Sequence, residues 1–136
     1  MENNQNTEPL KGFETATAEE MKDFMANVVG DAGKIALKNQ GGFVVYLDFL
    51  QMADSGSTAR ISGDRKAITL GFTRILDPDG YGIPDGAIIT VYADVRLGRD
   101  NTAPVWVRYV KDHGSTAYFS ISGTTFDNEL GFTGLS

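Results

Sequence analysis

Cysteine is absent from the 136-residue chain, and histidine and tryptophan occur once each. The lack of cysteine excludes disulfides, a thiolate nucleophile and cysteine-ligated metal sites. No apolar run approaches the roughly 18 residues that a membrane-spanning helix needs, and no signal-peptide pattern opens the chain. We therefore expect a soluble protein, either cytoplasmic or released by a non-classical route, that forms one domain with its own core.

The formal net charge of −6 is unevenly distributed. Residues 1–31 hold seven acidic residues and two lysines, whereas the rest of the chain is nearly balanced. A protein that binds nucleic acid would present a basic face. We therefore expect no nucleic-acid partner.

The N-terminal region divides into two predicted segments. Residues 1–16 are polar and aperiodic, which is typical of a mobile acidic tail. Thr17-Ala-Glu-Glu20 matches a capping box, so an amphipathic helix is predicted over residues 17–30. A helix this short needs a partner for its apolar stripe, which could be an oligomer neighbour, a membrane or its own domain. The residues expected to make that contact are Met21, Phe24, Met25 and Val28.

From residue 33 onward the apolar residues recur with a period of two, as in half-buried strands. Turn-forming residues separate the runs, and no helical segment lies between them. The predicted fold class is therefore mainly β: a single antiparallel β-sandwich of about seven to eight strands over residues 33–136, with one N-terminal amphipathic helix. The alternating runs cover residues 43–49, 68–72, 89–95, 105–109, 117–121 and 129–135.

The sharpest local motif is Asp77-Pro-Asp-Gly-Tyr-Gly-Ile-Pro-Asp85. Its carboxylates, at the first, third and ninth positions, resemble short calcium loops in which oxygen atoms surround a hard cation. Tyr81 stands where a further ligand is usual. The alternative is a strand connection in which Asp, Pro and Gly supply turn geometry. The sequence leaves open a calcium site at Asp77, Asp79 and Asp85, and indicates no other cofactor.

No catalytic residue can be nominated from the sequence. His113, the single histidine, lies in a turn-like Lys-Asp-His-Gly segment with no nucleophile or second carboxylate to complete a catalytic group. We therefore expect a protein that is not an enzyme. A metal-dependent hydrolase built on the aspartate motif is the remaining enzymatic alternative.

Four large aromatic side chains are predicted to lie on the outer faces of the strands. If Phe43, Val45, Leu47 and Phe49 point inward, Tyr46 must point outward, and the same alternation applies to the other strands. Rings with a polar edge suit a lipid headgroup, a glycan or a protein partner. The alternative is that the N-terminal helix covers them. The predicted ligand-binding residues are Tyr46, Tyr92, Trp106 and Tyr118.

The segment Gly33-Lys-Ile-Ala-Leu-Lys-Asn-Gln-Gly-Gly-Phe43 follows the predicted helix and opens the predicted sandwich. This layout resembles the actinoporin-type cytolysins and the aegerolysin-like membrane-binding proteins. The resemblance implies a β-sandwich that docks on lipid headgroups through surface aromatics and, in actinoporins, a helix that detaches to enter the bilayer. It transfers no site residue, because this chain has one tryptophan, scattered tyrosines and an acidic helix that anionic membranes would repel.

Two functions of different classes follow from these patterns. The first is a non-enzymatic surface-binding module, lectin-like or cytolysin-like as in toxins, whose partner is a membrane lipid or a glycan. The second is a self-assembling structural subunit whose N-terminal arm makes the contacts of a homo-oligomer. We favour the first, because the unusual residues of the chain lie on predicted surfaces and loops.

Overall fold

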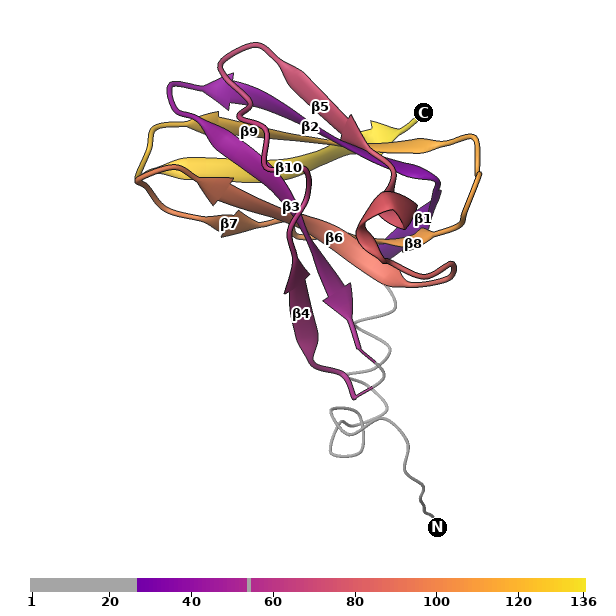
Figure 1. The fold of residues 1–136 in the computed structure, drawn as a ribbon. Helices are drawn as coiled ribbons and strands as arrows, with labels where there is room; N and C mark the ends of the chain where they lie inside the picture. Colours follow the sequence, from indigo (N-terminus) through magenta and orange to yellow (C-terminus); the bar gives the residue numbers. More distant parts are fainter. Residues whose placement is uncertain (1–26, 54) are drawn as a thin grey trace.

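Two facing β-sheets make up the part of the chain that the computed structural model describes, residues 27–53 and 55–136 (Figure 1). Their ten strands are β1 (Val28–Ala32), β2 (Lys34–Gly41), β3 (Val45–Met52), β4 (Thr58–Ile61), β5 (Thr73–Leu76), β6 (Ile88–Val95), β7 (Asn101–Thr102), β8 (Trp106–Tyr109), β9 (Thr116–Gly123) and β10 (Asn128–Leu135). A short 3-10 helix, η1 (Pro78–Tyr81), lies between β5 and β6. The expected seven to eight strands were too few, because strands as short as β4 and β7 show no clear alternation.

Both sheets are mixed, which corrects the expectation of a purely antiparallel sandwich. The six-stranded sheet has the order β1-β8-β6-β3-β4, with β7 also pairing with β6, and the four-stranded sheet has the order β10-β9-β2-β5. The β1–β8 and β2–β9 pairs are parallel. A parallel pair joins strands that are distant in sequence, so the alternation within each strand carries no sign of it.

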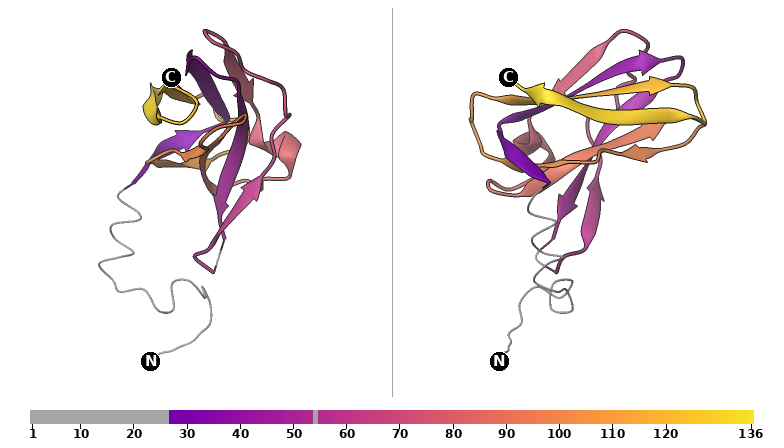
Figure 2. Two further views of the ribbon diagram at one scale, coloured as in Figure 1. Left: turned by 90° about the vertical axis from the view of Figure 1, so that its left-hand side faces the viewer. Right: turned by 180° about the vertical axis from the view of Figure 1, so that it is seen from behind.

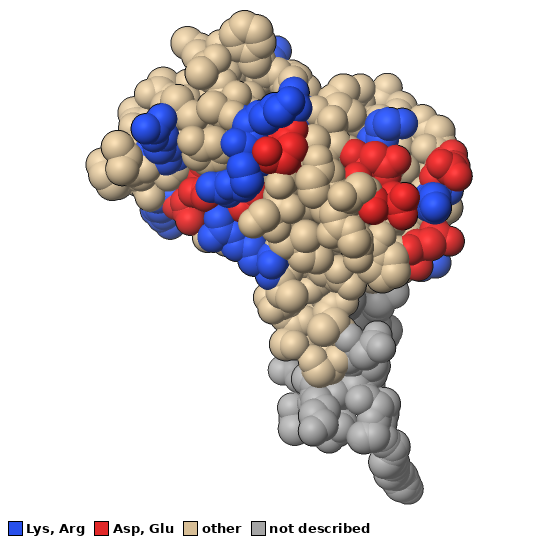
Figure 3. Space-filling view, in the orientation of Figure 1, with Lys and Arg blue, Asp and Glu red and all other residues tan. Residues whose placement is uncertain are grey.

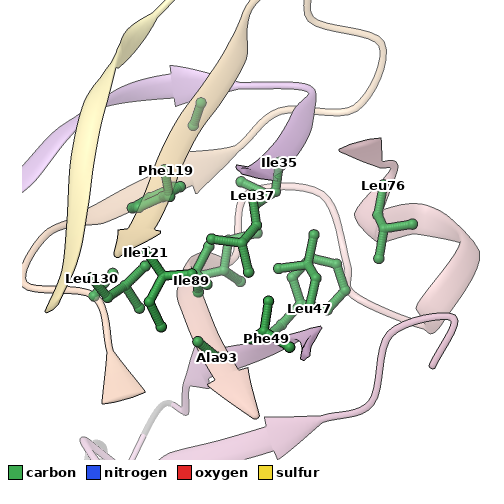
Figure 4. Packing of buried hydrophobic residues seen from close by; sticks show 14 of the residues in the cluster. Ile35, Leu37, Leu47, Phe49, Leu76, Ile89, Ala93, Phe119, Ile121 and Leu130 are labelled. Atoms are coloured by element: carbon green, nitrogen blue, oxygen red, sulfur yellow. The ribbon is translucent and has the colours of Figure 1, made fainter. Parts of the chain in front are cut away.

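The hydrophobic core lies between the two sheets. Val45, Leu47 and Phe49 of β3 are buried as their alternation predicts. Figure 4 shows side chains of β2 and β9 meeting those of β3 and β6 in one cluster. The period of two therefore correctly predicted which side of β3, β6 and β9 fills the core, whereas β2, with Ile35, Ala36 and Leu37 all buried, shows no such alternation.

The helix predicted over residues 17–30 is wrong at its C-terminal end. Residues 28–30 belong to β1, where Val28 is half-buried and pairs with Trp106 of β8. Valine has a stiff, branched side chain that suits a strand, and pairing with β8 overrides the helical spacing. The tail, the remainder of the helix and the contact residues Met21, Phe24 and Met25 lie outside the described residues.

The alternation of Ile68, Leu70 and Phe72 predicted a half-buried strand, and this prediction is also wrong. Ile68 is buried and forms a single bridge with Val45, but Leu70 and Phe72 are exposed. Gly71, with φ of 90°, turns the chain between them, and the Phe72 N–H donates to the Thr69 carbonyl at 3.0 Å. The turn projects the two apolar side chains away from the core.

Candidate functional site

Four connections gather at one end of the sandwich, which we call the loop end. They are residues 42–44 between β2 and β3, 66–72 before β5, 96–100 between β6 and β7, and 124–127 between β9 and β10. Three of these connections lie at the left-hand side of Figure 1, and the views in Figure 2 show the same grouping. The strand directions require it, since β2, β6 and β9 end where β3, β5 and β10 begin.

Hydrogen bonds hold the connections of the loop end against one another. The Arg99 N–H donates to the Thr125 carbonyl at 2.9 Å, and the Gly71 N–H donates to the Asn39 carbonyl at 2.7 Å. Asn39 is fully buried, and its side-chain amide donates to the carbonyls of Phe43 and Ile68 at 2.6 and 2.9 Å. These bonds fix the loops before any ligand arrives, so binding would cost little ordering of the backbone.

The loop end carries large apolar side chains in water. Leu97 has a positive φ of 54°, a backbone conformation that costs a bulky non-glycine residue free energy. Apolar side chains grouped on exposed loops mark an interaction surface. The exposed fractions are 62% for Leu70, 66% for Phe72, 86% for Leu97 and 71% for Phe126.

Cations accompany the apolar side chains. Lys66, Arg96 and Arg99 are exposed at the loop end, and no acidic side chain of the described residues forms an ion pair with them. In Figure 3, lysine and arginine are more frequent towards the loop end of the visible face, with acidic residues among them, and acidic residues are more frequent at the opposite end, again with basic residues among them. Asp100 and Asp127 lie in the same loops, so the charge of this end is mixed. Apolar side chains flanked by exposed cations suit an anionic membrane surface.

The predicted ligand residues Tyr46 and Tyr92 lie on the outer face of the six-stranded sheet, but arginines cover their rings. The guanidinium of Arg65 lies 4.4 Å from the centre of the Tyr46 ring, and that of Arg60 lies 4.2 Å from the centre of the Tyr92 ring. The Tyr92 hydroxyl donates to Asp100 at 2.7 Å. Because a cation already occupies one ring face, neither tyrosine offers that face to a sugar.

The same two arginines form a closed ring of ion pairs with two aspartates. Arg60 and Arg65 each bond to Asp48 and to Asp94, at distances between 2.7 and 2.9 Å. Partial burial acts to raise the pKa of Asp94, but the hydrogen bonds and charges of Arg65 and Arg60 outweigh it and hold that pKa below its ordinary value. The ring ties β4 and the following loop to β3 and β6, which is a structural role.

Trp106 and Tyr118, the other predicted ligand residues, lie on different sheets. Trp106 belongs to β8 of the six-stranded sheet, and Tyr118 belongs to β9 of the four-stranded sheet. Both are half-buried. Since both alternate with residues that point into the core, they face opposite sides of the sandwich. Trp106 therefore shares the outer face of the six-stranded sheet with Tyr92, and Tyr118 cannot join them in one site.

The three aspartates of the proposed calcium loop lie around η1, at the end opposite to the loop end. The Asp77 Oδ1 atom accepts bonds from the Asp79 N–H and the Tyr109 hydroxyl, both at 3.0 Å, and Asp85 accepts from the Lys111 N–H at 2.8 Å. No group of three or more acidic or histidine side chains that could hold a metal ion occurs within residues 27–53 and 55–136. These contacts match the turn alternative.

Tyr109 provides a pH-dependent test of this end of the molecule. Burial and the hydrogen bond to Asp77 raise the pKa of Tyr109 to about 12. An unfolded chain loses this proton near pH 10, so the stabilisation is complete below pH 10 and is lost as the pH rises to about 12, by an amount on the order of 2 kcal/mol. We expect Tyr109→Phe to unfold with a weaker alkaline pH dependence than the wild type in urea titrations. Equal alkaline slopes would contradict this assignment.

None of the helical segments within the described residues is long and apolar enough to cross a membrane. Among the large exposed apolar side chains of these residues, Leu70, Phe72, Leu97 and Phe126 lie in loops, and Val29, Ile75 and Leu135 lie in strands. The sequence patterns did not predict Leu97 and Phe126 as surface contact residues, although each is a large apolar residue between turn-forming neighbours. A large apolar residue inside a predicted turn was the feature of the sequence that could have identified them.

No known protein family matches the sequence, and no curated protein matches it. Several solved structures resemble part of this fold. Listeriolysin O is 21% identical, with a TM-score of 0.43 over 74% of this chain, and a protein described as a Gram-negative toxin is 17% identical, with a TM-score of 0.45 over 74%. The cytotoxin suilysin from Streptococcus suis is 12% identical, with a TM-score of 0.38 over 75%.

This chain spans only 22% of the first two of those proteins and 23% of suilysin. None of these three proteins is described as an actinoporin or an aegerolysin, the families that the sequence layout resembles. At these scores the likeness carries no conclusion about activity.

Proposed function

We propose that this protein is a non-enzymatic module that binds a lipid membrane surface through its loop end. The observation that carries the proposal is the grouping of Leu70, Phe72, Leu97 and Phe126, all more than half exposed, on hydrogen-bonded loops at one end of the sandwich. A water-soluble fold gains nothing from exposing these side chains. Contact with the boundary between lipid headgroups and acyl chains would remove them from water.

The energetics of this contact are favourable. A leucine or phenylalanine side chain gains about 1.5–3 kcal/mol when it is fully removed from water. Each lysine or arginine close to an anionic membrane adds about 1 kcal/mol. Lys66, Arg96 and Arg99 lie among the apolar loops, so both contributions act at the same end. We expect reversible binding that is stronger on anionic vesicles and weaker at high salt.

The test compares flotation of the purified protein with phosphatidylcholine vesicles and with vesicles that also contain phosphatidylserine. We expect the double variant Leu97→Ser/Phe126→Ser to bind both kinds about 100-fold more weakly, because two apolar contacts are lost. Arg96→Glu/Arg99→Glu should reduce binding to the phosphatidylserine vesicles far more than to neutral ones. Thermal unfolding of each variant checks that the fold is retained.

Leu135→Ser is the matched control. Leu135 is an exposed leucine at the end of β10, at the opposite end of the sandwich from the loops. We expect this variant to bind like the wild type. Absence of binding to both vesicle types, or an equal loss in the control variant, would contradict the proposal.

A further inference from the structure

A polar groove crosses β10 next to the loop end. Its volume is about 470 Å³, within the range of small-ligand sites. On one side lie residues of β7 and the segment after it, and on the other lie serines of β9. Figure 2 shows β10 and β9 from behind, side by side. The side chains that line the groove include Asn101, Thr102, Pro104, Ser120, Ser122 and Glu129.

Gly131 lines the groove without filling it. It lies in β10 directly opposite Ser120 of β9, and it lines the groove at a position where a strand would normally carry a side chain. A Cβ atom added there would meet nothing within 4 Å. Gly131 has no left-handed φ, so the backbone does not require glycine. Glycine at a free position in a strand interior weakens the strand, and close approach of a ligand is one established reason for it.

The wall of the groove is held in place by an amide network. The Asn101 Nδ2 atom donates to the Asn128 Oδ1 atom at 2.8 Å, and the Asn128 Nδ2 atom donates to the Arg99 carbonyl at 2.9 Å. Asn128 is buried. With Nδ2 engaged, the Oδ1 atom of Asn101 is the acceptor left for another molecule. The groove therefore has a preorganised polar edge.

The chemistry of the lining selects a neutral, hydroxylated ligand. Three hydroxyl side chains can donate and accept, while Glu129 and Asn101 offer acceptors for pairs of hydroxyl groups. Glu129 forms no ion pair with a lysine or arginine within the described part of the chain, so its charge would repel an anion. Pro104 adds an apolar surface for the C–H groups of a sugar ring.

We propose that this groove binds a neutral sugar, and that the sugar is the headgroup of a glycolipid. This inference rests on the proposed function, because the groove lies directly behind the apolar loops. Asn128, which lines the groove, also donates to the carbonyl of Thr125, the neighbour of Phe126. The groove and Phe126 could therefore contact the same membrane at the same time, one through a headgroup and the other through lipid. The two contacts would then add to the overall affinity.

An array of neutral glycans provides the test of the groove. We expect at least one neutral glycan to retain the wild-type protein, and Gly131→Val to reduce that retention about tenfold or more, because the new side chain fills the groove. Glu129→Gln should weaken retention without filling the groove. Gly114→Val is the matched control, since Gly114 also has open space around it but lies in a turn at the opposite end. Retention of no neutral glycan, or unchanged retention by Gly131→Val, would overturn the proposal.

The source of the sugar is tested with the same glycan, free in solution and displayed as a glycolipid in phosphatidylcholine vesicles. We expect tighter binding to the vesicles, and loss of this gain in Leu97→Ser/Phe126→Ser with free glycan binding unchanged. A glycan that binds equally in both forms overturns the glycolipid assignment. If vesicle binding is retained in Gly131→Val but lost in Leu97→Ser/Phe126→Ser, the loop end binds membranes and the groove binds no headgroup. The two variants therefore test the groove and the loop end separately.

Discussion

Phe49→Ala is expected to lower the free energy of unfolding by about 3–5 kcal/mol, the usual cost of truncating a fully buried phenylalanine. Phe49 has no exposed surface, and it lies in β3 at the middle of the core cluster. Its ring centre lies 5.7 Å from that of Tyr81, so the same side chain also supports η1. The loss therefore combines a cavity between the sheets with a weaker anchor for the segment that leads into β6.

Leu97→Ala is the control for this prediction, because it also removes apolar atoms. Leu97 is 86% exposed, so its truncation should change stability by no more than about 0.5 kcal/mol. Urea unfolding followed by tryptophan fluorescence measures both variants. We expect opposite results in vesicle flotation, where Leu97→Ala weakens binding and Phe49→Ala, if folded, does not. Equal losses of stability in the two variants would contradict the observed difference in burial between Phe49 and Leu97.

Asp48→Asn is expected to cost about 2–4 kcal/mol, somewhat below the loss for an ion pair with both partners buried. The Asp48 carboxylate is fully buried and accepts bonds from Arg60, Arg65 and the Gly63 N–H. Asparagine keeps the shape but removes the charge, and its amide nitrogen cannot accept. Because the side chains of Arg60 and Arg65 are about two-fifths exposed, water solvates their charges and replaces part of the lost interaction with the carboxylate.

Asp112→Asn provides the comparison for Asp48→Asn. Asp112 is exposed in a turn with φ of 64°, a conformation that asparagine also adopts readily. Its replacement should leave the urea midpoint almost unchanged. An Asp48→Asn variant as stable as Asp112→Asn would mean that the ring of ion pairs contributes nothing to the fold.

The loop end and the groove divide binding between two kinds of surface. Leu97 and Phe126 offer apolar contact without specificity, whereas the groove at Gly131 offers hydrogen bonds that depend on the ligand. The segment that includes Asn128 connects the two, since it contacts both the Arg99 and the Thr125 carbonyls. Affinity from one surface and selectivity from the other would suit a module that must recognise a particular membrane.

The sequence patterns predicted the interior better than the surface. Alternation located β3, β6, β8, β9 and β10, and in β3 it named the buried side chains. The same rule failed at Leu70 and Phe72, where Gly71 turns the chain before a strand can continue. By the same alternation as Tyr46, Asp48 belongs to the outer face of β3, yet its side chain is buried, because the arginines that cover it come from β4 and the loop after it.

By itself, the sequence determined a mainly β fold without disulfides, most of the strands with clear alternation and the buried side of those strands, because these depend on the order of neighbouring residues. Only the tertiary structure decided the parallel pairings, the grouping of Leu97 with Phe126, the cover over Tyr46 and Tyr92, and the groove at Gly131. Each of these requires contacts between residues far apart in the chain, such as Arg60 and Asp94, 34 positions apart. Local patterns carry no information about which distant strands and loops will meet.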